Sequence, residues 1–145
     1  MPELTEEERE ELERSILELN RGRALMEAMR EQAALLNTTL SELSSTIETI
    51  KKLKEVPEGT EVLTPIGSGS FVRARLMPLE KILTGVGAEV VVERTPDEAL
   101  KFLEEKSSEV GKAVQQLRSE MANLEQRMES LRPGIEKLLS KTREK

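Results

Sequence analysis

Apolar residues recur at alternating spacings of three and four in two long segments of the chain. Such a heptad repeat is typical of a helix that buries one stripe against a partner helix with the same repeat. In the first segment the repeat comprises Met26, Met29, Ala33, Leu36, Leu40, Leu43, Ile47 and Ile50. In the second it comprises Leu100, Leu103, Val110, Val114, Leu117, Met121, Leu124, Met128, Leu131, Ile135 and Leu138. The pattern predicts two long helices that fold back on each other as an antiparallel coiled-coil hairpin.

The ends of these helices carry recognisable signals. The first helix is predicted from about Leu12 to Glu55, roughly 65 Å at ~1.5 Å per residue, with its seam entering through Leu12, Ile16 and Leu19. Pro57-Glu58-Gly59 follows as a stop signal. Residues 6–11 are almost entirely acidic and are predicted to fray. The second helix is predicted to begin at Pro96, because Thr95 is a good N-cap and proline suits the first helical position.

Between the helices, short alternating runs predict four strands at residues 61–66, 71–76, 81–86 and 89–93. Turns at Gly67-Ser68-Gly69-Ser70 and Gly87-Ala88 join them into two β-hairpins. The fold class is therefore α+β, and the predicted parts are an N-terminal coiled-coil helix (1–56), two β-hairpins for oligomerisation (57–95) and a C-terminal coiled-coil helix (96–145).

The predicted strands need a covering that two helices cannot supply. Isolated two-stranded hairpins are marginal in water, and Val90-Val91-Val92 is apolar on both faces. Pairing with strands of other subunits in a closed β-barrel would leave no edge exposed, which predicts an obligate oligomer. The candidate oligomerisation residues are Val62, Leu63, Ile66, Phe71, Val72, Ala74, Leu76, Ile82, Leu83, Val86, Val90, Val91 and Val92. A small sheet that caps its own helix hairpin is the alternative.

Composition narrows the class of protein. Only 1% of the 145 residues are aromatic and 34% are charged, which fits narrow two-helix packing better than a compact core. A net charge of −6 with interspersed Lys and Arg offers no basic stripe for nucleic acid. There is no apolar run long enough for a membrane span, and the acidic N-terminus does not resemble a signal peptide. With no cysteine, we expect a soluble cytoplasmic protein.

Candidate catalytic chemistry is missing. The chain has no His and no Cys, and its single Asp, Asp97, is accounted for by helix capping. Gly67-Ser68-Gly69-Ser70 lacks the ending of a phosphate-binding loop and leads into a strand rather than a helix. We therefore expect no enzyme activity, no cofactor and no metal site.

Two positions are predicted to weaken the far end of the coiled coil. Gly22 falls on a seam position, where glycine costs about 1 kcal/mol relative to alanine, and Pro133-Gly134 interrupts the second helix. Folding the hairpin about its middle places these positions near the same height. The distal end is therefore predicted to bend or fray.

The order of elements resembles that of a known family. A long helix, then Val62-Leu63-Thr64-Pro65-Ile66-Gly67-Ser68-Gly69-Ser70-Phe71-Val72, Leu83-Thr84-Gly85-Val86-Gly87-Ala88-Glu89-Val90-Val91-Val92-Glu93 and a second long helix is similar to a prefoldin alpha subunit of the archaeal type. Two hairpins indicate the alpha class, since beta-class subunits carry one. The resemblance implies a hexamer of two alpha and four prefoldin beta subunits, with the hairpins in a double barrel.

The resemblance also implies an ATP-independent holdase that captures unfolded client proteins and passes them to a group II chaperonin. A holdase needs accessible apolar surface, which a frayed coiled-coil tip could supply. The candidate client-binding residues are Leu12, Ile16, Leu17, Leu19, Leu25, Met128, Leu131, Ile135, Leu138 and Leu139. The alternative function is a structural or adaptor coiled-coil protein that binds one defined partner.

Overall fold

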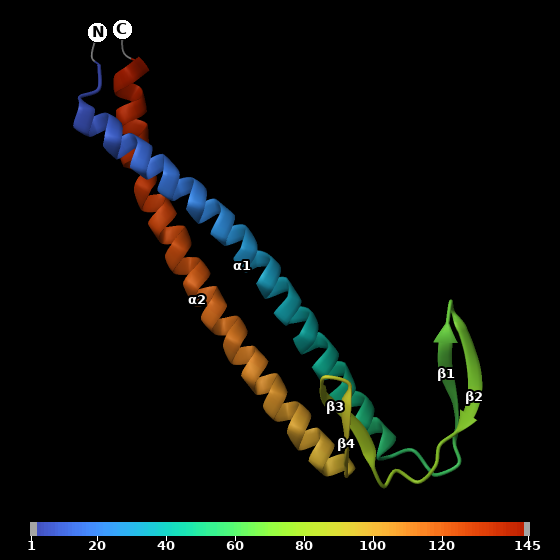
Figure 1. The fold of residues 1–145 in the computed structure, drawn as a ribbon. Coiled ribbons are helices and arrows are strands. Elements are labelled where there is room, and N and C mark those ends of the chain that lie inside the picture. The colour runs from blue at the N-terminus through green and yellow to red at the C-terminus, as the bar shows by residue number, and fades with distance from the viewer. Residues whose placement is uncertain (1–2, 144–145) are drawn as a thin grey trace. The chain divides into compact units, whose positions relative to one another are not determined.

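The computed structural model describes residues 3–143 and contains two long helices with four strands between them (Figure 1). Its elements are α1 (Glu6–Leu53), β1 (Glu61–Gly67), β2 (Ser70–Arg75), β3 (Ile82–Gly87), β4 (Val90–Arg94) and α2 (Pro96–Arg143). This order confirms the predicted fold class, and each strand lies within one residue of its predicted range.

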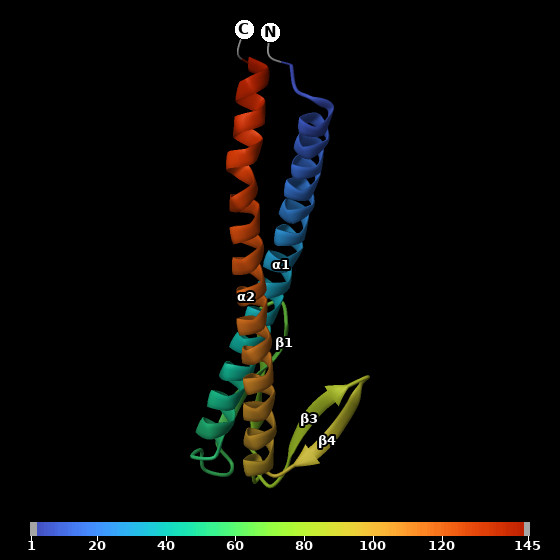
Figure 2. The same ribbon diagram turned by 90° about the vertical axis from the view of Figure 1, so that its left-hand side faces the viewer.

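The chain forms two compact units, and both helices pass through each of them. One unit joins the first part of α1, as far as Thr38, to the part of α2 that begins at Lys112, and the other is Thr39–Gly111. Within each unit α1 and α2 lie antiparallel and side by side (Figures 1 and 2).

Both helices begin with a threonine cap. The backbone N–H of Glu98 donates to Thr95 Oγ1 at 3.1 Å, as predicted. At the start of α1, the Glu8 N–H donates to Thr5 Oγ1 at 3.1 Å and the Thr5 N–H donates back to Glu8 Oε2 at 3.2 Å. This reciprocal pair is a capping box, and it makes the predicted fraying of residues 6–11 wrong.

The strands form two separate two-stranded antiparallel sheets, β1 with β2 and β3 with β4. The register shifts by one residue between Pro65 and Gly67 and again between Gly85 and Gly87, so each hairpin has a bulge beside its turn. Both central residues of each turn have positive φ, which is the requirement of the tight turns that match strand twist.

The core of Thr39–Gly111 lies where the helices meet the second hairpin. Leu43, Ile50, Ala99 and Leu103 form a buried cluster. Packed against it are Ile47, Ile82, Leu100, Phe102 and Val110. Lys54, just after α1, pairs with Asp97 in the first turn of α2, which joins the two helix ends.

In the other unit the core is a single seam between the helices. Its buried apolar residues are Met26, Val114, Leu117, Ile135 and Leu138. The seam enters α1 through Leu12, Ser15 and Leu19, all half-buried, whereas Ile16 is 38% exposed. The prediction of Ile16 as a seam residue is therefore wrong, because the heptad phase continues through the small polar Ser15.

The predicted weak points behave differently from expectation. α2 remains helical through Pro133, which is exposed, and α1 remains helical through Gly22, which is buried. Gly22 faces Met128 and Leu124, while Arg132 and Ile135 lie beside Leu19 and Arg23. The prediction that the distal end frays at these positions is wrong for the described residues, because both helices continue through them.

Candidate functional site

The hairpins expose most of the apolar residues that were predicted to mediate oligomerisation. Val62, Leu76, Ile82 and Val92 are half-buried, and the other nine are exposed: Leu63, Ile66, Phe71, Val72, Ala74, Leu83, Val86, Val90 and Val91. Leu63 and Leu83 reach 64% and 67% exposure. So many exposed apolar side chains on two short hairpins indicate a binding surface.

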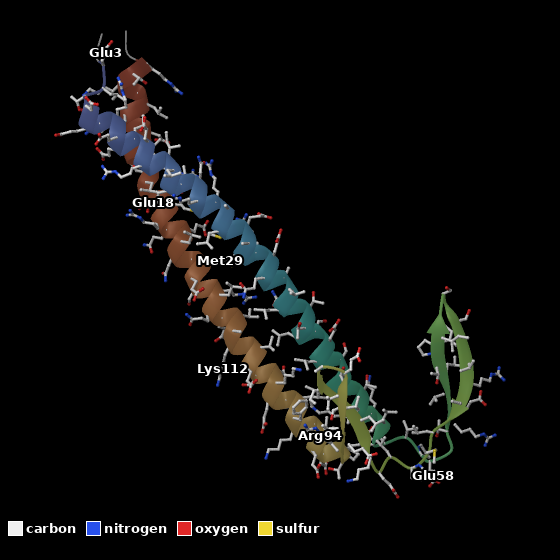
Figure 3. All side chains as sticks on the ribbon, in the orientation of Figure 1. Glu3, Glu18, Met29, Glu58, Arg94 and Lys112 are labelled. Atoms are coloured by element: carbon white, nitrogen blue, oxygen red, sulfur yellow. The ribbon has the colours of Figure 1, made fainter. Side chains whose placement is uncertain are left out.

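The hairpin β3–β4 is fixed to α2 through one of its faces. Ile82 packs against the buried cluster, and the Arg94 guanidinium lies 4.1 Å from the centre of the Phe102 ring. Arg94 Nε donates to Thr84 Oγ1 at 2.9 Å, and Thr84 Oγ1 donates to the Val92 carbonyl at 3.1 Å. Figure 3 shows Arg94 beside the start of α2. This network orients the hairpin and leaves its other face, with Leu83 and Val91, open.

The hairpin β1–β2 is held at its base by the backbone. The Gly59 N–H donates to the Leu76 carbonyl at 2.8 Å, and the Leu76 N–H donates to the Thr60 carbonyl at 2.9 Å. Its side chains add one exposed ion pair, between Arg73 Nε and Glu61 Oε1 at 3.5 Å. No side chain of β1 or β2 belongs to the buried cluster of the described residues, so both faces of this hairpin are available.

The predicted client-binding residues all lie in the unit formed by α1 up to Thr38 and α2 from Lys112 onward, and they fall into three groups. Ile135 and Leu138 are buried in the seam, at 8% exposure each. Leu12, Leu19, Met128, Leu131 and Leu139 are half-buried. Ile16, Leu17 and Leu25 are exposed, at 38%, 49% and 50%. Only the last group presents substantial apolar surface while the helices stay together.

Two ion pairs join α1 to α2 in this unit. Arg127 donates to Glu18 through Nε at 2.7 Å and through Nη2 at 3.2 Å, a bidentate arrangement. Lys141 Nζ donates to both Glu8 oxygens, at 2.7 and 2.9 Å. These hydrogen bonds lower the pKa of Glu18 and of Glu8. The pairs therefore stabilise the unit above the ordinary carboxyl pKa, and that contribution is lost as the pH falls through the lowered values.

An open groove lies between the helices beside the first of these pairs. Its volume is about 190 Å³. Its lining residues are Glu18, Arg21, Gly22 and Leu25 from α1 and Leu124, Arg127, Met128 and Leu131 from α2. Glu18 lies on the part of α1 that runs alongside α2 (Figure 3). The groove is apolar inside and charged only at its rim.

Several of these features were not predicted from the sequence. The spacing of Thr5 and Glu8 is a capping-box signature and could have been recognised. The contact of Gly22 with Met128 and the stacking of Arg94 on Phe102 join residues that are far apart in sequence, and no local pattern marks them.

Two kinds of feature are absent from residues 3–143. No group of three or more His, Cys, Asp or Glu side chains there is arranged to hold a metal ion. No helix in the same range is long and apolar enough to cross a membrane.

Comparison with known proteins identifies the class. The prefoldin subunit family matches residues 22–141. The chain is 40% identical to prefoldin subunit alpha of Methanopyrus kandleri over 74% of this chain and 69% of that protein. It is 33% identical to prefoldin subunit alpha of Pyrococcus horikoshii over 81% and 80%. The chain therefore belongs to the prefoldin family, and the resemblance to an archaeal alpha subunit is confirmed.

Solved structures agree with this assignment. A chain of filamentous PFD from Methanocaldococcus jannaschii aligns with a TM-score of 0.71 at 28% identity, covering 79% of this chain and 94% of that one. The prefoldin beta subunit from Thermococcus strain KS-1 aligns with a TM-score of 0.60, covering 94% and 96%. At 14% identity, the second match shows the shared fold alone.

Proposed function

We propose that this chain is a subunit of an ATP-independent molecular chaperone, a holdase that captures non-native polypeptides and delivers them to a group II chaperonin. The observation that carries the proposal is where the exposed large apolar side chains occur. Among the described residues they lie either on α1 between Ile16 and Leu35 or on the segment from Leu63 to Val91. One set suits transient binding on a helical surface, and the other suits permanent pairing of strands.

We propose the exposed apolar residues of the hairpins, from Leu63 to Val91, as the assembly surface. Residues 57–95 would pair with prefoldin beta subunits and with a second copy of this chain, in a hexamer of two alpha and four beta subunits. The support is that nine of the thirteen predicted oligomerisation residues are exposed in the single chain, and that unpaired strand edges and apolar faces favour strand addition. Closing the strands into a barrel would cover both.

We propose the apolar residues of the helices as the client surface. Leu17 and Leu25 are accessible without any rearrangement, whereas Ile135 and Leu138 can meet a client only if α1 and α2 separate. Half-buried Met128 adds a deformable side chain that suits varied clients. Clients would bind in the cytoplasm, and the chain would supply binding surface rather than catalysis.

An aggregation assay tests the holdase. The full chain, assembled with a prefoldin beta subunit, is mixed with a chemically denatured model protein in the absence of ATP. We expect suppression of light scattering at stoichiometric amounts, and transfer of the captured protein when a group II chaperonin is added. An assembled complex that leaves aggregation unchanged would contradict the holdase and favour an adaptor role.

A further inference from the structure

The groove between Glu18 and Leu25 has the dimensions of a site for a single side chain. An apolar cavity of about 150 Å³ is enough to admit a benzene ring, and this groove measures about 190 Å³. Leu25, Leu124, Met128 and Leu131 supply its apolar lining. Leu25 is 50% exposed, so burying it under a ligand would remove apolar surface from water.

Gly22 determines the depth of the groove. A Cβ atom at this position would lie 2.9 Å from Met128 Cγ and 3.0 Å from Met128 Sδ, closer than real carbon contacts. Because glycine has no Cβ, the Met128 side chain lies directly against the α1 backbone. Any other residue at position 22 would force the Met128 side chain to shift, and it would therefore change the shape of the groove that Met128 lines.

The rim of the groove carries one surplus positive charge. Glu18 and Arg127 neutralise each other through their bidentate pair. Arg21 has no carboxylate within 4.0 Å among residues 3–143, so its guanidinium is free to bind an anion. Since arginine binds carboxylates in a planar, bidentate geometry, the charge of this rim is complementary to an acidic side chain.

The opposite side of the same coiled coil differs. There the lining residues are Leu19, Arg23, Arg132, Ile135 and Glu136, and Ile135 is buried in the seam. Charged side chains dominate this surface, and Arg132 already pairs with Glu129 at 3.4 Å. Arg23, which is only two residues from Arg21, thus lies beside a much less apolar surface.

We propose that the groove beside Gly22 binds one leucine, methionine or phenylalanine side chain of a non-native polypeptide that has an acidic residue next to it, with Arg21 as the partner of that carboxylate. The inference rests on the proposed holdase function and defines the class of client sequence that this subunit selects.

Peptide binding tests this selectivity. Two fluorescein-labelled peptides share the same Leu and Phe residues, flanked in one by Glu and in the other by Lys, and are titrated by anisotropy against the full chain in its assembly. We expect the acidic peptide to bind about tenfold more tightly at low salt, and the difference to shrink as salt is added. Arg21→Glu should abolish the preference, while Arg23→Glu, with the same change in charge, should keep it.

The apolar part of the site has its own matched pair of variants. Leu25→Ser should weaken binding of both peptides about fivefold, whereas Leu35→Ser, which changes a leucine that is 70% exposed on the same helix, should leave it unchanged. Circular dichroism checks that both variants remain folded.

Three outcomes would overturn the proposal: equal affinity for the two peptides, equal effects of Arg21→Glu and Arg23→Glu, or a changed mass of the assembly in Leu25→Ser. The last outcome would make the groove an interface between copies of this chain. Selective peptide binding without suppression of aggregation would support the groove and contradict the holdase, so the two failures are distinguishable.

Discussion

The two hairpins are built alike and supported differently. Val62-Leu63-Thr64 and Ile82-Leu83-Thr84 are twenty residues apart, as are the bulges and the turns that follow them. Yet Thr84 is 7% exposed and bonded to Arg94, whereas Thr64 is exposed. Ala74 occupies the position equivalent to Arg94, so β1–β2 has no side chain that could make the same contact.

The two hairpins thus form in the same way but differ in what holds them in position. Turn and bulge residues are sufficient for the backbone of both hairpins. The Arg94, Thr84 and Phe102 contacts then place the second hairpin on α2, while no side chain of β1 or β2 makes a comparable contact with the helices among the described residues. Both hairpins keep an open apolar face, which is the feature that assembly requires.

The largest effect is expected from charges on the open faces. Phe71 and Val91 occupy equivalent positions and are each 56% exposed in the single chain. Phe71→Asp or Val91→Asp should leave the helices folded but weaken assembly at least about a hundredfold, because burying an unpaired carboxylate costs roughly 3 kcal/mol or more. Sedimentation velocity measures the loss. Ser68→Asp, which adds the same charge in the turn, should assemble normally, and its failure to do so would show that net charge rather than burial controls assembly.

Removing the anchor should loosen only the second hairpin. Phe102→Ala removes the ring that Arg94 covers and its packing against the buried cluster, at a cost of about 2 kcal/mol for a half-buried aromatic residue. Amide hydrogen exchange should show faster exchange in β3 and β4 and no change in β1 and β2. Lys106 lies farther from the ring, at 6.0 Å, so Lys106→Ala is the control. Equal loosening of both hairpins would contradict the comparison.

The equivalent threonines provide a finer test. Thr84→Val removes the acceptor of the Arg94 hydrogen bond and should destabilise the chain by about 1 kcal/mol. Thr64→Val removes no side-chain bond and should be neutral or slightly stabilising, since valine favours strands. Denaturant midpoints of the two variants measure the difference, and equal midpoints would show that the Thr84 network contributes nothing.

The turns should give the smallest effect. Gly69 and Glu89 occupy equivalent positions with φ of 74° and 61°, where a side chain is unfavourable. Glu89→Gly should therefore stabilise the second turn by about 0.5 kcal/mol, and Gly69→Ala should destabilise the first by about 1 kcal/mol. Thermal denaturation measures both changes. The same sign for both variants would contradict the equivalence of the two turns.

The elements were predictable because their signals are local. Thr95-Pro96 marked the start of α2, and the glycines at 67, 69 and 87 marked the turns. The heptad repeat also predicted most of the seam, but it could not decide between Ser15 and Ile16, because hydrophobicity favours isoleucine while the phase of the repeat favours serine.

The candidate site was less predictable, because it depends on how the helices align. The identity of the residue facing Gly22 follows from the phase of both helices and from the length of the connection, which no single segment encodes. The arrangement of Arg21, Leu25 and Met128 around one groove therefore became visible only in three dimensions. Exposure of the hairpin residues, by contrast, agrees with the prediction that two helices cannot cover strands that are apolar on both faces, such as Val90-Val91-Val92.

We propose that the hairpins need strands from other subunits, and native mass measurement tests this need most directly. The full chain is measured alone and after mixing with a prefoldin beta subunit, beside the Phe71→Asp variant. We expect a complex of two copies of this chain with four beta subunits, and we expect the variant not to form it. A wild-type chain that stays monomeric in the mixture would contradict it.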